Sequence, residues 1–188
     1  MRRTRINFLF YYGKISKMEG SAMNWNFIKD LQRIYDTLDH WDVPTVERDY
    51  PIIWEKAHAT SCAQIGRMLA EIRNIDIEQA AFACALHDIG RWENGKQLEH
   101  ALNGGDPVRR FLAEGNYSEK NRELIVQAVV NHSKKEQIGT PLEELVKDAD
   151  LLDCHWHGEH SQKPYHIARL KKALSDLGIR CLNERLGQ

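Results

Sequence analysis

The sequence predicts an all-α fold, a single-domain helical bundle, from three observations. Apolar residues recur at intervals of three and four along most of the chain, which is the period of an amphipathic helix. No segment is a convincing strand. Residues typical of helix ends separate the periodic segments. The 188 residues are enough for one domain with a substantial core.

The first expected helix lies near residues 25–38, where apolar residues share one face. A loop rich in Asp and Pro follows. The second expected helix runs from Pro51 to Ile72, because proline is common in the first helical turn. A third is expected over residues 76–88, and "GRWENGKQ" after it reads as a loop.

The remaining expected helices cover residues 106–115, 118–132, 140–153 and 165–177. Asp106 and Pro107 fit the N-cap and first residue of one of them, and Gly115 closes it. Thr140 and Glu143 form a capping-box pattern for another. The domain therefore spans residues 23–188, and we expect residues 1–22 to be a tail of uncertain order, since Met18 and Met23 are alternative starts.

Composition narrows the function classes. The chain is 42% hydrophobic and 28% charged with a net charge of -1, so neither a nucleic-acid polymer nor a membrane is an expected partner. The apolar stretch at residues 6–12 is too short for a signal-peptide core or a membrane span. The four cysteines show no CxxC spacing, which favours reduced thiols and a cytoplasmic location. A small-molecule partner is expected, and the oligomeric state is left open.

Several polar residues continue the apolar stripes of the expected helices: His58, His87, His132 and Asp150, with Asp88 adjoining. Any one of them alone is also consistent with a core histidine whose nitrogens are bonded, or with an aspartate that caps a helix or pairs with arginine. Together they need one another or a common ion, because burying an unpaired polar group costs roughly 2–7 kcal/mol. Imidazole and carboxylate suit Mn, Fe, Co, Ni or Zn, and carboxylates favour attack of metal-activated water on phosphorus.

The order "H58…H87-D88…D150" resembles the metal-binding signature of the HD-domain superfamily of metal-dependent phosphohydrolases. "HDIG" begins 29 positions after His58, and "VKDADLLD" lies in a later helix. The resemblance covers about residues 50–155. "EHALNGGDPVRRFL", with His100, and "IVQAVVNHSKK", with His132, resemble segments of small bacterial members that hydrolyse dinucleoside polyphosphates.

The resemblance implies a divalent metal centre of one or two ions, drawn from Mn, Fe, Co, Ni, Zn and Mg. By position, the first ion would be held by His58, His87, Asp88 and Asp150. The second would be held by Asp88, His100 and His132. Asp150 is favoured over Asp148 because the family's last aspartate follows an alanine, and Asp148 is expected on a polar face. The glycines after His100 depart from the family's pattern and leave its register open.

A phosphate site also needs positive charge near the metals. Substrate binding is assigned to Arg91, Lys96 and Lys135. Catalysis is assigned to Asp88, Glu93 and Lys134, with Glu99 as a second candidate for proton transfer. Any one basic residue alone is more typical of a solvated surface, and Glu93 and Glu99 are equally consistent with surface carboxylates. The roles of three further histidines stay open: His155, His157 and His160. Trp92 and Trp156 are consistent with base stacking or with packing.

The function predicted from these observations is hydrolysis of a nucleotide or another small phosphate ester through metal-activated water. Two alternatives stay open. One is an HD-type di-iron oxygenase, and the other is a non-catalytic metal-binding module. The sequence does not specify the substrate.

Overall fold

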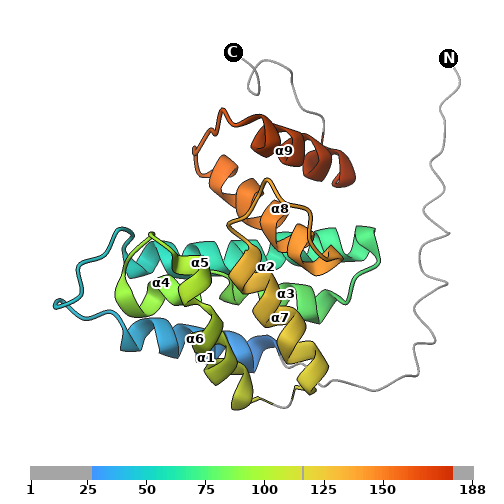
Figure 1. The fold of residues 1–188 in the computed structure, drawn as a ribbon. Coiled ribbons are helices and arrows are strands. Elements are labelled where there is room, and N and C mark those ends of the chain that lie inside the picture. Colours follow the sequence, from blue (N-terminus) through green and yellow to red (C-terminus); the bar gives the residue numbers. More distant parts are fainter. Residues whose placement is uncertain (1–26, 116, 180–188) are drawn as a thin grey trace, which may run out of the picture.

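The computed structural model describes residues 27–115 and 117–179, and all regular secondary structure in them is helical (Figure 1). The predicted all-α fold is therefore confirmed. The predicted tail, Trp25 and Cys181 lie outside the described residues. Among the described residues, no helix is long and apolar enough to cross a membrane.

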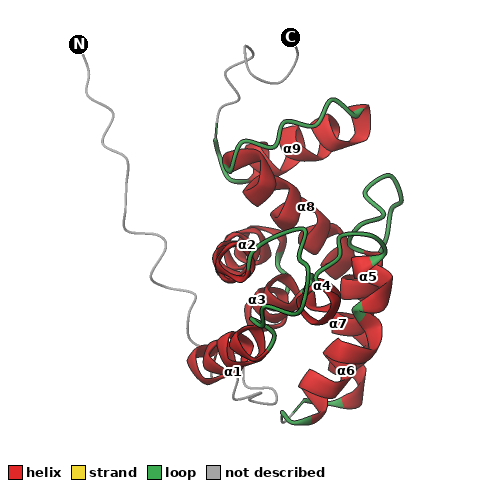
Figure 2. Ribbon diagram, turned by 90° about the vertical axis from the view of Figure 1, so that its left-hand side faces the viewer, coloured by secondary structure: helices red, strands yellow, loops and turns green. Residues whose placement is uncertain are grey.

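The described residues form nine helices: α1 (Phe27–His40), α2 (Ile52–Arg73), α3 (Ile77–Leu86), α4 (Ile89–Asn94), α5 (His100–Asn103), α6 (Gly105–Ala113), α7 (Glu119–Asn131), α8 (Pro141–Trp156) and α9 (Pro164–Asp176). Figure 2 shows α2 and α3 in the middle of the bundle, with α1 on one side and α8 and α9 on the other. Helices α4 to α7 cover the remaining side.

Small side chains bring the central helices close together. Helix α3 contains a fully buried run from Ala80 to Ala85, four of whose six residues are alanine. A Cβ on Gly66 of α2 would lie 2.6 Å from the Sγ of Cys84, so the two backbones approach closely here. Larger apolar side chains such as Phe82 and Leu69 complete the core around this contact. Full burial of one such side chain contributes about 1.5–3 kcal/mol.

Two of the three helix starts predicted from capping residues are confirmed, those at Ser118 and Thr140. The Ser118 side chain accepts a hydrogen bond from the backbone N–H of Asn121, and Thr140 does the same for Glu143. Helix α8 continues three residues beyond the predicted end at Asp153. These starts were predictable because a cap and its partner lie within one turn of the chain.

The boundary predicted between the helix over residues 76–88 and the loop after it was wrong. Helix α3 ends at Leu86, and "IGRWEN" forms the separate helix α4. Asp88 lies between them with φ −97° and ψ 11°, outside helical geometry. Trp92 is completely buried, and this packing holds a short helix that sequence periodicity does not reveal.

The predicted helix start at Asp106 and Pro107 was also wrong. Helix α6 begins at Gly105, directly after the short helix α5. Helix α4 packs against α5 through Gly90, where an added Cβ would lie 2.2 Å from the carbonyl oxygen of His100. Only a residue without a side chain permits this approach of the two backbones.

Asp148 was predicted on a polar face, but its side chain is buried. Its carboxylate lies 2.8 Å from a guanidinium nitrogen of Arg73 on α2 and 3.0 Å from one of Arg169 on α9. The expectation failed because α9 covers this face of α8. The ion pairs join α8 to α9 and to α2, which is far from both in the sequence.

We expect Asp148→Ala to lower the free energy of unfolding by roughly 2–3 kcal/mol, because Arg73 and Arg169 lose the buried carboxylate that they share and keep only the partly exposed carboxylates of Asp176 and Glu144. Urea denaturation followed by circular dichroism measures the change. Glu119→Ala is the control, since it removes an exposed carboxylate from its pair with Arg122 and should cost less than about 1 kcal/mol. Equal losses in the two variants would contradict a structural role for Asp148.

Candidate metal centre

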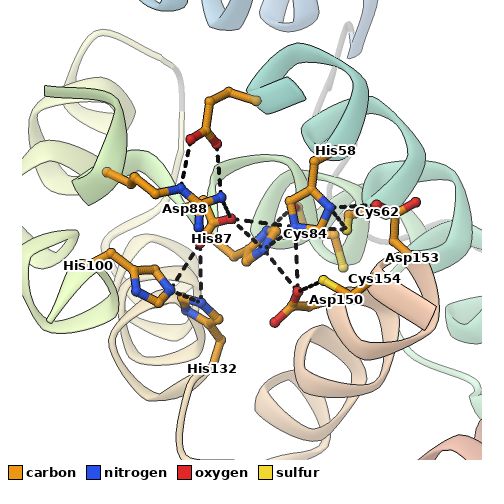
Figure 3. Close-up of polar contacts among 12 residues, drawn as sticks. His58, Cys62, Cys84, His87, Asp88, His100, His132, Asp150, Asp153 and Cys154 are labelled. Atoms are coloured by element: carbon orange, nitrogen blue, oxygen red, sulfur yellow. Dashed lines mark hydrogen bonds and ion pairs between the residues drawn. The ribbon is translucent and has the colours of Figure 1, made fainter. Parts of the chain in front are cut away.

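The six residues predicted as metal ligands come together in the structure (Figure 3). They come from five parts of the chain: α2, the α3–α4 junction, α5, the C-terminal end of α7, and α8. All but His87 line a pocket with a volume of about 450 Å³. The structure thus brings the predicted metal ligands together at one cavity.

Four of these residues form a first donor group: His58, His87, Asp88 and Asp150. The Nε2 atoms of His58 and His87 lie 3.1 Å apart. Asp88 Oδ2 lies 3.4 Å and 3.3 Å from these two nitrogens, and Asp150 Oδ1 lies 3.4 Å and 3.7 Å from them. Metal–ligand bonds of about 2.1 Å place neighbouring donors of a tetrahedral ion about 3.4 Å apart, so these distances suit one ion.

A second donor group consists of Asp88, His100 and His132. The Nε2 atoms of His100 and His132 lie 2.9 Å apart, and Asp88 Oδ1 is 3.1 Å and 3.4 Å from them. The two oxygens of Asp88 therefore face different donor groups. This is the arrangement of a carboxylate that bridges two ions.

The histidine tautomers also fit a metal. In His87, His100 and His132, Nδ1 lies 2.7 Å from the carbonyl oxygen of the residue three positions earlier. A carbonyl only accepts, so Nδ1 carries the proton, and Nε2 of a neutral ring presents a lone pair. Burial lowers the pKa of His132 to about 4, which keeps its ring neutral. Two lone pairs that face each other at 2.9 Å repel unless a proton or a metal ion lies between them, so this geometry suits a pair of metal ligands.

The ring of His58 is oriented by a carboxylate that sequence reasoning missed. Its Nδ1 lies 2.5 Å from Asp153 Oδ2, and the Ser61 hydroxyl donates to the other oxygen of Asp153. Asp153 is buried and follows Asp150 by three residues on α8, so both face α2. The spacing within "DADLLD" is the signal that predicts this second inward carboxylate.

The buried carboxylates attract positive charge. Burial raises their pKa, but the charges of His87 and Arg91 outweigh this for Asp88 and hold its pKa well below the usual range. For Asp150, burial is outweighed mainly by the ammonium of Lys135, so its pKa is also well below the usual range. Both carboxylates are therefore ionised at neutral pH and available to a cation.

The same carboxylates raise the pKa of two of the histidines. Burial lowers the pKa of His87, but the charge of Asp88 and a hydrogen bond with Asp150 outweigh it and raise the pKa to about 10. Hydrogen bonds with Asp150 and Asp153 outweigh burial at His58 in the same way, again to about 10. Without an ion, protons supply the positive charge that the site requires.

Two of the predicted basic residues reach the pocket. Arg91 is buried, and its guanidinium is bonded to both oxygens of Glu55, at 2.7 Å and 3.0 Å, and to Asp88 Oδ2 at 2.5 Å. Lys135 is also buried, with its Nζ 2.5 Å from Asp150 Oδ2. From the pocket wall, Arg91 therefore fixes the carboxylate of Asp88, and Lys135 fixes that of Asp150. Sequence reasoning missed Glu55, which fixes the position of Arg91.

Other predicted site residues lie outside this pocket: Glu93, Lys96, Lys134 and Glu99. The first three are held by surface partners, which are Arg110, Glu47 and Asn131 respectively. Glu99 is exposed. Their nearness in sequence to the predicted ligands was misleading, because the position of a long side chain depends on the partner that it reaches and not on its neighbours in the sequence.

The three histidines that follow Cys154 have different surroundings. His160 lines the pocket and its Nδ1 lies 3.2 Å from that of His155. His157 instead packs edge-on against Trp54, with ring centroids 4.8 Å apart. Trp92 is packed in the core, and Trp156 lines a separate hollow, so the aromatic residues of this pocket are Tyr50, Trp54 and Tyr165.

Comparison with known proteins agrees with this geometry. The family "HD domain" matches residues 56–154, just over half of the chain. A Bacillus subtilis (strain 168) protein named "Putative phosphohydrolase YueE" is 27% identical over 137 residues, which are 64% of this chain and 78% of that protein. No solved structure matches the chain significantly.

We expect Asp153→Asn to weaken divalent-metal binding by about 10- to 100-fold, because the amide no longer orients His58 as the carboxylate does. Competition with a chromophoric chelator measures the affinity, and circular dichroism verifies the fold. Asp39→Asn is the matched control, since that carboxylate pairs with Lys56 on the surface. Unchanged affinity in Asp153→Asn would show that the contact with His58 has no role in metal binding.

Proposed function

The chain belongs to the HD domain family, and we propose that it is a metal-dependent phosphohydrolase acting on a nucleotide or another small phosphate ester. The observation that carries the proposal is the pair of donor groups that share Asp88 at the base of a pocket. The family implies a divalent metal, and the named relative supports phosphohydrolase activity.

In this proposal each donor group holds one ion. The first ion is bound by His58, His87, Asp88 and Asp150, and the second by Asp88, His100 and His132. The distances and the Nδ1 hydrogen bonds support the assignment, because in each donor group the Nε2 atoms of two histidines lie close to each other and to an oxygen of Asp88. Nitrogen donors favour Mn, Fe, Co, Ni or Zn over Mg.

When bound, such ions polarise a phosphoryl oxygen and lower the pKa of a water molecule toward about 7. The chain's own residues bind and orient. Lys135 places an ammonium on the pocket wall beside Asp150, where it attracts the negative charge of a phosphate ester. Arg91 serves mainly to fix Asp88, since Glu55 and Asp88 already occupy its donors.

Aromatic side chains at the pocket support a nucleotide as substrate. Tyr50 and Trp54 both line the pocket, stacked with ring centroids 6.2 Å apart and planes inclined by 27°. Trp54 also stacks on His58, and the Arg91 guanidinium lies over the ring of Tyr50, so these rings offer a base an apolar wall to pack against. They take the base-contacting role considered for Trp92 and Trp156. Because the three described cysteines are free thiols, we also place the protein in the cytoplasm, with a small-molecule phosphate as its partner.

Metal analysis tests the two-ion assignment. Native protein purified without chelator should contain close to two ions per chain. His132→Ala should lower this to about one, because only the second donor group loses a ligand, and Asp88→Ala should remove nearly all metal. Asp148→Asn, with its fold verified by circular dichroism, should keep both ions. One ion per chain in both native protein and His132→Ala would reduce the centre to a single site.

A phosphate-release screen over nucleotides and small esters with Mn, Fe, Co, Zn and Mg should identify a substrate. In water labelled with oxygen-18, a single turnover should then place one solvent oxygen in the phosphoryl product, because water attacks directly. A phosphorylated side chain on the reaction path, or label only in the leaving group, would contradict this. Turnover that consumes oxygen and releases no phosphate would identify an oxygenase instead.

A further inference from the structure

A thiol lies at the edge of the first donor group and is outside every ligand set predicted from the sequence. Cys154 follows Asp150 by four residues on α8, so both side chains project from one face of the helix. Its Sγ lies 3.4 Å from Asp150 Oδ1, the same oxygen that faces His58 and His87 (Figure 3). Cys154 also lines the pocket, so its sulfur is at the cavity that holds the donor atoms.

We propose that Cys154 is a further ligand of the ion in the first donor group and binds it as a thiolate. The inference rests on the proposed function, because it requires that ion. The S–H bond breaks, its proton leaves to solvent, and a sulfur–metal bond forms without any change of oxidation state. Without an ion, the thiol keeps its proton and donates it to Asp150.

The distances fit a sulfur ligand. With Cys154 the ion would have five ligands, and in a five-coordinate ion metal–sulfur bonds of about 2.3 Å and metal–oxygen bonds of about 2.1 Å separate neighbouring donors by about 3.1–3.8 Å. The observed separation of Sγ from Asp150 Oδ1 is 3.4 Å. The sulfur, an oxygen of Asp150 and a ring nitrogen of His58 also lie within 4.8 Å of one another. The three donor atoms are therefore close enough together to be candidate ligands of one ion.

A second cysteine near His58 is less suited to the same ion. Cys62 Sγ lies 3.6 Å from Nδ1 and 3.8 Å from Nε2 of His58. An atom almost equally distant from both ring nitrogens does not lie in the direction of the Nε2 lone pair. Cys62 is fully buried, does not line the pocket, and directs its sulfur at the carbonyl oxygen of Ala149. It therefore packs against the ring.

A thiolate has a consequence for the choice of ion. Sulfur is a soft donor that favours zinc, cobalt or iron, whereas carboxylate and water favour magnesium. A first donor group that includes Cys154 selects a thiophilic ion, while the second donor group contains only nitrogen and oxygen. The two positions of the centre then differ in the ion that each prefers.

Cobalt(II) spectroscopy tests the proposal independently of any substrate. Wild-type protein loaded with cobalt should show a near-ultraviolet sulfur-to-cobalt charge-transfer band beside the visible bands of the ion. Cys154→Ser and Cys154→Ala should both lose the charge-transfer band and keep the visible bands, because the remaining ligands still hold cobalt. Cys62→Ala is the matched control and should keep both.

Zinc affinity supplies a second measurement. Cys154→Ser should bind zinc at least about tenfold more weakly than wild type at the first donor group, since loss of a direct ligand costs no less than loss of an orienting partner. Cobalt bound without a charge-transfer band would overturn the thiolate and leave the metal centre standing. Loss of the band in Cys62→Ala alone would overturn the choice of Cys154. Protein that binds no cobalt would overturn both this proposal and the metal centre.

Discussion

The carboxylate of Asp88 is the group on which the arrangement of the site depends. It lies between two pairs of histidines and offers one oxygen to each pair. In a continuous helix, adjacent residues project in different directions. The break between α3 and α4 removes this restriction, so His87 and Asp88 direct their donor atoms to within 3.3 Å of each other. The end of α3 thus converts two neighbours in sequence into two ligands of one candidate site.

Features encoded within one helical turn were predictable from the sequence, and features set by distant partners were not. Helix periodicity and caps predicted the long helices, and the same periodicity predicted that His58, His132 and Asp150 point inward. Helices α4 and α5 are too short for a periodic pattern, and contacts through Trp92 and Gly90 hold them.

The long basic side chains were the least predictable part of the site. A lysine or arginine extends several ångströms from the backbone, so its position depends on which carboxylate lies within reach. Arg91 is drawn to Glu55, 36 residues earlier, and Lys135 to Asp150. Lys96 is drawn to Glu47 on the surface. Nearness in sequence to a ligand did not distinguish Arg91 and Lys135, which reach the pocket, from Lys96, which does not.

The part of the chain beyond the family match also supports the site. Arg169 of α9 donates to the carbonyl oxygens of Lys135 and Gln137, at 2.6 Å and 3.2 Å, and pairs with the buried Asp148. These bonds hold the segment that follows His132 against α8. The last helix therefore fixes the wall of the pocket although it contributes none of the predicted ligands.

The glycine of "HDIG" sets the scale of the whole centre. Gly90 touches the backbone of α5 at the carbonyl of His100 and at the amide nitrogen of Gly104, where an added Cβ would lie 2.2 Å and 2.5 Å away. Any larger residue must push α5 outward and carry His100 away from Asp88. The distance between the two donor groups thus depends on the absence of a side chain at Gly90. A change there alters the width of the centre while every ligand keeps its chemical identity.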